Sequence, residues 1–243
     1  MHQTALTPGT ERRSQVHPAL KDVADHMRDL GLGALTHALR LSLYSDPDNP
    51  SWGDLSVLNG AHAAEILIKA RIADEHPLLI FSQIPRSTQA GGPLLTFDDL
   101  FEKGQTIDFQ DLPERLWAVT GQTLPNPEVY REFGRLRNAI QHFASPSNDS
   151  SALTLEFVFK VLDPFIFQNW GLYAIDYNEE CGDHYDHIFD SLVTRDIRPL
   201  ISPAAAAVWK NPSFTPGPDA PAGYATWFTA ALEKTLAGNH ETA

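Results

Sequence analysis

Hydrophobic residues along this chain recur mostly at steps of three and four, the spacing that places side chains on one face of an α-helix. Few stretches alternate with a period of two, so the sequence predicts little β-strand. Segments rich in proline and glycine interrupt the helical patterns and mark the loops. The expected fold class is therefore all-α, an up-and-down helical bundle with additional short helices and a C-terminal arm.

The predicted helices are unevenly distributed along the chain. The first pattern, over residues 16–43, breaks near Gly31-Leu32-Gly33 and so predicts two helices. Further helices are expected at residues 54–74, 97–104, 112–121, 127–143, 152–176, 180–195 and 224–237. Residues 199–223 contain six prolines and six alanines, which predicts a linker or a surface arm. We therefore expect a helical domain at 1–198 and an arm with a short helix at 199–243.

The amino-acid composition argues against several classes of protein. With 42% hydrophobic residues the chain can bury a core, and it has no run of about 18 apolar residues that would span a bilayer. Arg12 and Arg13 are not followed by the apolar stretch of a secretory signal, so we expect a cytoplasmic protein without membrane contact. The single cysteine, Cys181, excludes an intramolecular disulfide, and the net charge of −13 argues against a general nucleic-acid-coating protein.

The segment 127–143 has the clearest helical pattern. Asn126 is placed to cap the helix, Pro127 suits its first position, and Glu128 favours its positive end. The expected core face consists of residues spaced by three and four: Val129, Phe133, Leu136, Ile140 and Phe143.

Polar residues occupy the opposite side of that helix. Arg131, Arg135, Asn138 and His142 cluster there, and two further polar residues lie on one flank: Arg137 and Gln141. One interpretation is a solvated face, since arginine and glutamine are ordinary surface residues. The other is an anion-binding surface with one acid/base group, because an imidazole, guanidiniums and a carboxamide gather together.

A second helix, at about 54–74, is apolar around most of its circumference and is expected to be central in the bundle. His62, Glu65 and Lys69 form a narrow polar stripe on it. Glu65 and Lys69 fit an i,i+4 ion pair on the one exposed edge. The alternative is that the stripe faces the polar side of the helix at 127–143.

These two helices resemble a known family. The run Arg137-Asn138-Ala139-Ile140-Gln141-His142 is similar to the RxxxxH signature of HEPN domains, and HAAEILIKARIADEHPLLIF at 62–81 resembles the helix that precedes it there. The resemblance covers roughly residues 15–195. It implies a helical bundle, commonly a homodimer, and many members are metal-independent endoribonucleases of toxin, antiviral or RNA-processing systems. Other members are non-catalytic, so activity does not follow from the fold.

The resemblance also assigns roles. The catalytic arginine and histidine fall on Arg137 and His142, and the polar residue between them on Asn138. RNA supplies its own nucleophile, the 2′-hydroxyl, so the protein needs an acid/base and positive charge but no cofactor or metal. RNA is the expected substrate, with an antitoxin or defence protein as a possible partner. Residues expected to bind substrate are Arg131, Arg135, Gln141, His62, Glu65 and Lys69.

One geometric difficulty accompanies this assignment. Arg137 and His142 are five residues apart, about 140° around an ideal helix, so they do not share a face. Arg135 and His142 do share one, and Arg135 is the substitute if Arg137 is structural. Either a long arginine reaches around the helix, or two copies of the helix meet and build one site together.

Two other classes stay open. Cys181, Asp183, His184, Asp186 and His187 lie within seven residues and offer metal-ligating side chains, although no facing ligand set is evident elsewhere. The other class is a non-catalytic module that binds a nucleotide or a partner chain through its arginine and histidine face, which the low net basicity favours.

Overall fold

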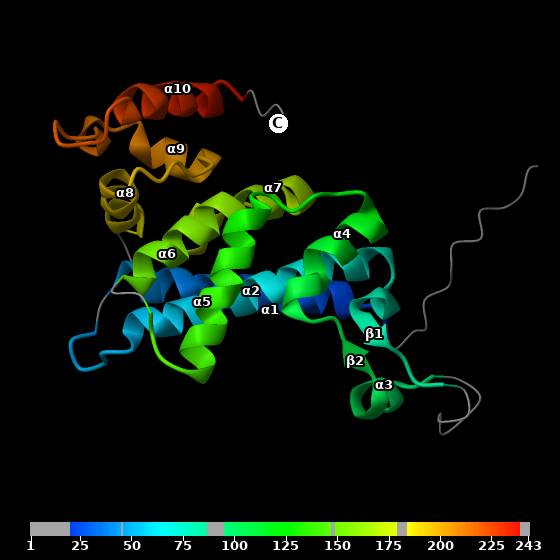
Figure 1. The fold of residues 1–243 in the computed structure, drawn as a ribbon. Helices are drawn as coiled ribbons and strands as arrows, with labels where there is room; N and C mark the ends of the chain where they lie inside the picture. The colour runs from blue at the N-terminus through cyan, green and yellow to red at the C-terminus, as the bar shows by residue number, and fades with distance from the viewer. Residues whose placement is uncertain (1–19, 45, 87–94, 147–148, 179–183, 239–243) are drawn as a thin grey trace, which may run out of the picture.

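The computed structural model describes residues 20–44, 46–86, 95–146, 149–178 and 184–238. These parts are mostly helical with a small two-stranded antiparallel sheet, which confirms the all-α class (Figure 1). Within them, no helix combines the length and apolarity needed to cross a lipid bilayer. The elements are α1 (Val23–Leu43), α2 (Trp52–Glu75), η2 (Pro77–Ile80), β1 (Phe81–Gln83), α3 (Phe97–Lys103), β2 (Gln105–Thr106), η3 (Phe109–Asp111), α4 (Leu112–Thr120), α5 (Pro127–His142), α6 (Ser150–Phe157), η4 (Val158–Leu162), α7 (Asp163–Trp170), η5 (Ala174–Tyr177), α8 (His184–Thr194), α9 (Pro203–Trp209), η6 (Pro212–Phe214) and α10 (Tyr224–Leu236).

The helix α2 is the centre of the fold, as its apolar circumference predicts. It contacts α1 along its length and also contacts α4, α5 and α6. Figure 1 shows α1 and α2 side by side, with α5 crossing them and α8, α9 and α10 gathered at one end of the molecule. Buried residues occur on nearly every side of α2, among them Val57, Ala64, Leu67 and Ile68. A helix surrounded in this way fixes the positions of the side chains on each neighbour.

The prediction of two helices before residue 44 is wrong, because α1 runs unbroken through Gly31 and Gly33. Gly31 is buried against α2, where an added Cβ would lie 2.7 Å from Leu67 Cγ and 3.2 Å from the Leu67 backbone nitrogen. The glycine therefore permits close helix packing instead of ending the helix. The pattern of the sequence alone does not separate these two uses of glycine.

This packing makes a testable distinction between two glycines of one helix. We expect Gly31→Ala to lower the free energy of unfolding by about 1–3 kcal/mol, because the added methyl group overpacks the α1–α2 contact. Gly33→Ala is the matched control: nothing lies within 4 Å of its added Cβ, so the higher helix propensity of alanine should stabilise the protein by roughly 0.5–1 kcal/mol. Urea unfolding of both variants measures the difference, and the same sign for both would contradict the packing argument.

The helix predicted at 152–176 ends earlier than expected and contains a π-helical turn. After α6 the chain makes the π-helical turn η4, continues as α7, and ends at Trp170, where Gly171 adopts a left-handed φ of +67°. Pro164 has no backbone N–H to donate to the Lys160 carbonyl oxygen one turn earlier. That oxygen instead accepts a hydrogen bond from Asn126 Nδ2 at 2.7 Å. The π-helical turn thus lies directly before a proline that cannot donate within the helix.

The segment after residue 198 contains a helix that the sequence analysis assigned to a linker. Ser202 caps α9 by accepting from the Ala205 N–H at 3.0 Å, and Pro203 occupies its first turn. The rings of Phe189, Trp209 and Phe228 pack together with centroids 5.2–5.7 Å apart, joining α8, α9 and α10. The boundary between 1–198 and 199–243 stays a prediction.

A buried carboxyl group holds the same segment on the bundle. Asp163 is fully buried, and its two oxygens accept from the backbone N–H groups of Ala174 at 2.9 Å and Leu200 at 2.7 Å. Asp176 in turn accepts from the hydroxyls of Tyr185 and Ser202. Backbone donors that would otherwise be buried without partners are thereby satisfied.

Candidate functional site

The buried face of α5 is rotated from the one predicted. Tyr130, Phe133 and Gly134 are buried, whereas Phe143 is 97% exposed because the helix ends at His142. The other predicted core residues are only half-buried against the core: Val129, Leu136 and Ile140. An added Cβ on Gly134 would lie 2.8 Å from the Phe109 ring, so the missing side chain admits that ring. The apolar pattern predicts neither Gly134 nor Tyr130 as a core residue.

The rotation changes the position of Arg137. Residues 130, 133, 134 and 137 lie at steps of three and four, so Arg137 continues the buried stripe and is itself half-buried. The helical pattern predicts Arg137 on the flank of α5, between the core face and the polar side. Its guanidinium Nη1 donates to Asn138 Oδ1 at 3.0 Å. The arginine is thus directed toward the neighbouring carboxamide.

The start of α5 also differs from the prediction. Asn126 makes no side-chain cap and adopts a left-handed φ of 45°. Its amide is used by the Lys160 carbonyl that Pro164 leaves without a donor. The capping prediction is wrong because a tertiary acceptor competes for the same side chain.

Arg137 and Asn138 line a polar pocket of about 400 Å³. Its remaining lining comes from α2 and from the segment that includes η3: Glu65, Asp108, Phe109, Gln110 and Asp111. The sequence analysis had identified Glu65 but not residues 108–111. No periodic signal marks that segment, because its position depends on the stack of Phe109 on Tyr130, with ring centroids 4.3 Å apart.

The polar stripe of α2 points partly into this region. Lys69 Nζ lies 2.7 Å from Glu65 Oε1 and donates to Thr106 Oγ1 at 3.2 Å. The expected ion pair therefore exists, but its placement on an exposed edge is wrong, since Lys69 is buried. His62 is exposed and does not line the pocket. Glu65 is thus the residue of the stripe that reaches the polar side of α5.

Two charged residues of the same pocket, Glu65 and Arg137, act on the pKa of Tyr130. Burial raises the pKa of the Tyr130 phenol far above its usual value, the nearby Glu65 carboxylate raises it further, and the Arg137 guanidinium lowers it. The phenol therefore stays protonated at neutral pH and donates to the Phe109 carbonyl oxygen at 2.7 Å. Tyr130 is a structural support for the pocket wall.

The remaining predicted site residues lie on the outer surface of α5. Arg131, Arg135, Gln141 and His142 are exposed, and His142 is not among the residues that line the pocket. Asn138 is half-buried and lies four residues before His142, so both project from one side of the helix. The structure thus brings Arg137 and Asn138 together and leaves the imidazole one turn further along.

The alternative metal site falls partly outside the described ranges. Cys181 and Asp183 are not described, while Asp186 is exposed and the His187 ring packs edge-on against Tyr44 at 5.5 Å. In the described parts of the chain no three histidine, cysteine, aspartate or glutamate side chains cluster in a way that could hold a metal ion.

Comparison with known proteins gives no independent assignment. No protein-family model, no curated protein and no solved structure matches this chain.

Proposed function

We propose that this chain is a metal-independent endoribonuclease with a HEPN-like fold, and that Arg137, Asn138 and His142 form its catalytic site. The observation that carries the proposal is the hydrogen bond from Arg137 to Asn138, 3.0 Å long. It holds the guanidinium beside the carboxamide that shares a helix side with His142. Arg137 and His142 lie about 140° apart on an ideal helix. The bond therefore supports the explanation in which the long Arg137 side chain reaches around α5 toward the side that carries His142.

In the proposed reaction the RNA 2′-oxygen bonds to the adjacent phosphorus and the bond from phosphorus to the 5′-oxygen breaks. An imidazole accepts the 2′-hydroxyl proton, and the 5′-oxygen takes up a proton as it leaves. The Arg137 guanidinium stabilises the negative charge that grows on the phosphoryl oxygens. The products are a 2′,3′-cyclic phosphate and a 5′-hydroxyl.

The proposal includes a homodimer. One imidazole accepts a proton while a second donates one, and a two-fold pairing of α5 would supply two copies of His142. The exposed end of α5 offers apolar surface for such a pairing, because Phe143 is 97% exposed there. Arg131 and Arg135 on the same exposed surface add positive charge for a phosphate chain.

The test is cleavage of single-stranded RNA in the presence of a chelator. We expect His142→Ala to lower the rate at least 10²-fold without unfolding the protein, the usual size of a general acid/base contribution. His37→Ala is a matched control, because His37 is exposed on α1 away from this site and its loss should leave the rate unchanged. Full activity of His142→Ala, or 5′ fragments that end in a 3′-hydroxyl, would refute the mechanism.

A second function is favoured by the charge of the pocket. Glu65, Asp108 and Asp111 line it beside Arg137, and carboxylates repel a phosphate chain. This arrangement fits a non-catalytic module that binds a partner by its polar groups. The same assay separates the two: RNA that stays intact with wild-type protein under all salt conditions tested would support the binding module.

A further inference from the structure

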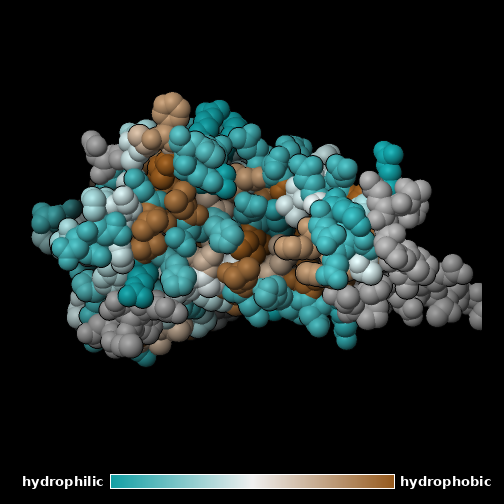
Figure 2. Space-filling model, turned by 90° about the horizontal axis from the view of Figure 1, so that it is seen from below, coloured by the Kyte–Doolittle hydropathy of each residue, from teal (hydrophilic) through white to brown (hydrophobic). Residues whose placement is uncertain are grey.

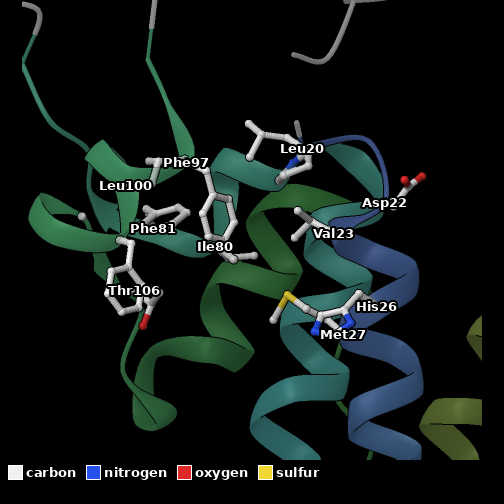
Figure 3. Close-up of a pocket in the computed structure, with 13 residues that line it drawn as sticks. Leu20, Asp22, Val23, His26, Met27, Ile80, Phe81, Phe97, Leu100 and Thr106 are labelled. Carbon is white, nitrogen blue, oxygen red and sulfur yellow. The ribbon is translucent and has the colours of Figure 1, made fainter. Parts of the chain in front are cut away.

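A second cavity, which shares no lining residue with the polar pocket, lies between the start of α1 and α3 and has a volume of about 480 Å³ (Figure 3). Figure 3 shows Leu20, Val23 and Met27 on the α1 side, facing Phe97 and its neighbours on the other side. The lining is predominantly apolar and consists of Leu20, Asp22, Val23, His26, Met27, Pro77, Ile80, Phe81, Phe97, Leu100, Phe101, Gly104 and Thr106.

The mouth of this cavity exposes large aromatic rings. Phe97 and Phe101 are one turn apart on α3, and they are 55% and 83% exposed. Deeper in the cavity, Leu20, Ile80 and Leu100 are buried. Figure 2 shows hydrophobic patches set separately among hydrophilic residues on the face that it presents. Exposed phenylalanines beside an apolar cavity are typical of a binding site, since a ligand removes both rings from water.

The charges around the mouth decide what kind of ligand fits. Asp22 lines the cavity, whereas Asp98 and Glu102 are exposed on α3 and are not among the residues that line it. The cation on that helix, Lys103, is held by Asp99 at 3.0 Å. On the α1 side Arg28 is likewise held by Asp25 at 2.9 Å, and Lys21 is exposed next to Asp22 in the sequence. Asp22 is the acidic residue among those that line the cavity, and neither lysine nor arginine is among them, so the lining disfavours an anionic head group.

We propose that this cavity binds a small apolar molecule that carries a cationic group. The apolar part enters between Ile80, Met27 and Leu100, where it loses contact with water. The cationic group stays at the mouth, near the carboxylate of Asp22, and Phe97 and Phe101 cover it with aromatic faces. The proposal is independent of the ribonuclease site, because none of these residues belongs to α5 or its pocket.

Two probes with the same ten-carbon chain and opposite charge test the proposal: decyltrimethylammonium and decanoate, each below its micelle concentration. Isothermal titration calorimetry should show at least tenfold tighter binding of the cation by the full chain, with one site per protein. Equal binding of both probes, or tighter binding of decanoate, would overturn the assignment of charge. Absence of saturable binding by either probe would overturn the site itself.

Exposed aromatic residues provide variants that test the location. Phe101→Ser should weaken binding of decyltrimethylammonium at least fivefold, and an unchanged melting temperature would show that the fold is intact. Trp117→Ser removes a ring that is 58% exposed on α4 and lines neither cavity, and it should leave binding unchanged. Equal weakening by both variants would mean that the probe adsorbs to exposed rings in general. Asp22→Asn should reduce the preference for the cation over decanoate.

Discussion

Replacing Phe133 by alanine is expected to lower the free energy of unfolding by about 3–5 kcal/mol, the usual range for a large aromatic residue removed from a core. Phe133 is 4% exposed and stacks on Phe157 with ring centroids 3.9 Å apart. Its ring also fills the space over Gly60, where an added Cβ would lie 3.2 Å from Phe133 Cζ. Because α2, α5 and α6 meet at this ring, the surroundings have little freedom to close the resulting cavity.

Arg131→Ala is the control for that measurement, since Arg131 is exposed on the same helix two residues earlier. Its removal should change the free energy of unfolding by less than about 0.5 kcal/mol. Chemical denaturation of both variants gives the two values. Similar small values would contradict the observed orientation of α5, and with it the arrangement of Arg137 and Asn138.

Asp163 should make the stability of the protein depend on pH in an unusual direction. Burial raises the pKa of its carboxyl group from the ordinary 3.8 to about 7, although the backbone N–H groups of Leu200 and Ala174 oppose the shift. The folded chain then binds a proton that the unfolded chain has lost between about pH 4 and pH 7. The stability from this group is therefore complete below about pH 4 and is lost as the pH rises to about 7.

The comparison of wild type with Asp163→Asn isolates that effect from the other carboxyl groups. A shift of about three pKa units corresponds to about 4 kcal/mol, so the stability difference between wild type and variant should fall by about that amount from pH 4 to pH 7. Asp190→Asn, at an exposed position on α8, should show a nearly constant difference. A flat profile for Asp163→Asn would mean that the two backbone donors keep the carboxylate ionised.

Helical periodicity predicted which parts of the chain are helical better than how those helices pack. The predicted helices at 54–74 and 112–121 match α2 and α4 within a few residues, since propensity and proline or glycine boundaries are local properties. The prediction that a helix breaks near Gly31 is wrong, because this glycine makes room for the Leu67 side chain of α2, a contact that the local sequence does not show. The start of α9 was missed although Ser202 and Pro203 form a recognisable N-terminal signal.

The candidate site shows the same division between local and tertiary information. Arg137, Asn138 and His142 were identified from a motif within a single helix, and the structure gives the first two a mutual hydrogen bond. Asp108 and Asp111 were not identified, because their position beside Arg137 depends on the packing of Phe109 against α5. The role of Gly134 cannot be predicted from the sequence for the same reason, because this glycine leaves space for the ring of Phe109 from another segment.

Pro164, after α6, links the start of α5 to a distant segment of the chain. Pro164 frees the Lys160 carbonyl, and the Asn126 amide that occupies it anchors the residue immediately before α5. A carbonyl that lacks its usual donor four residues later thus binds the residue before another helix. Residues 126 and 164 should consequently constrain each other: Pro164→Ala would restore an N–H that competes for the Lys160 oxygen, and it should weaken the bond of Asn126 at the start of α5.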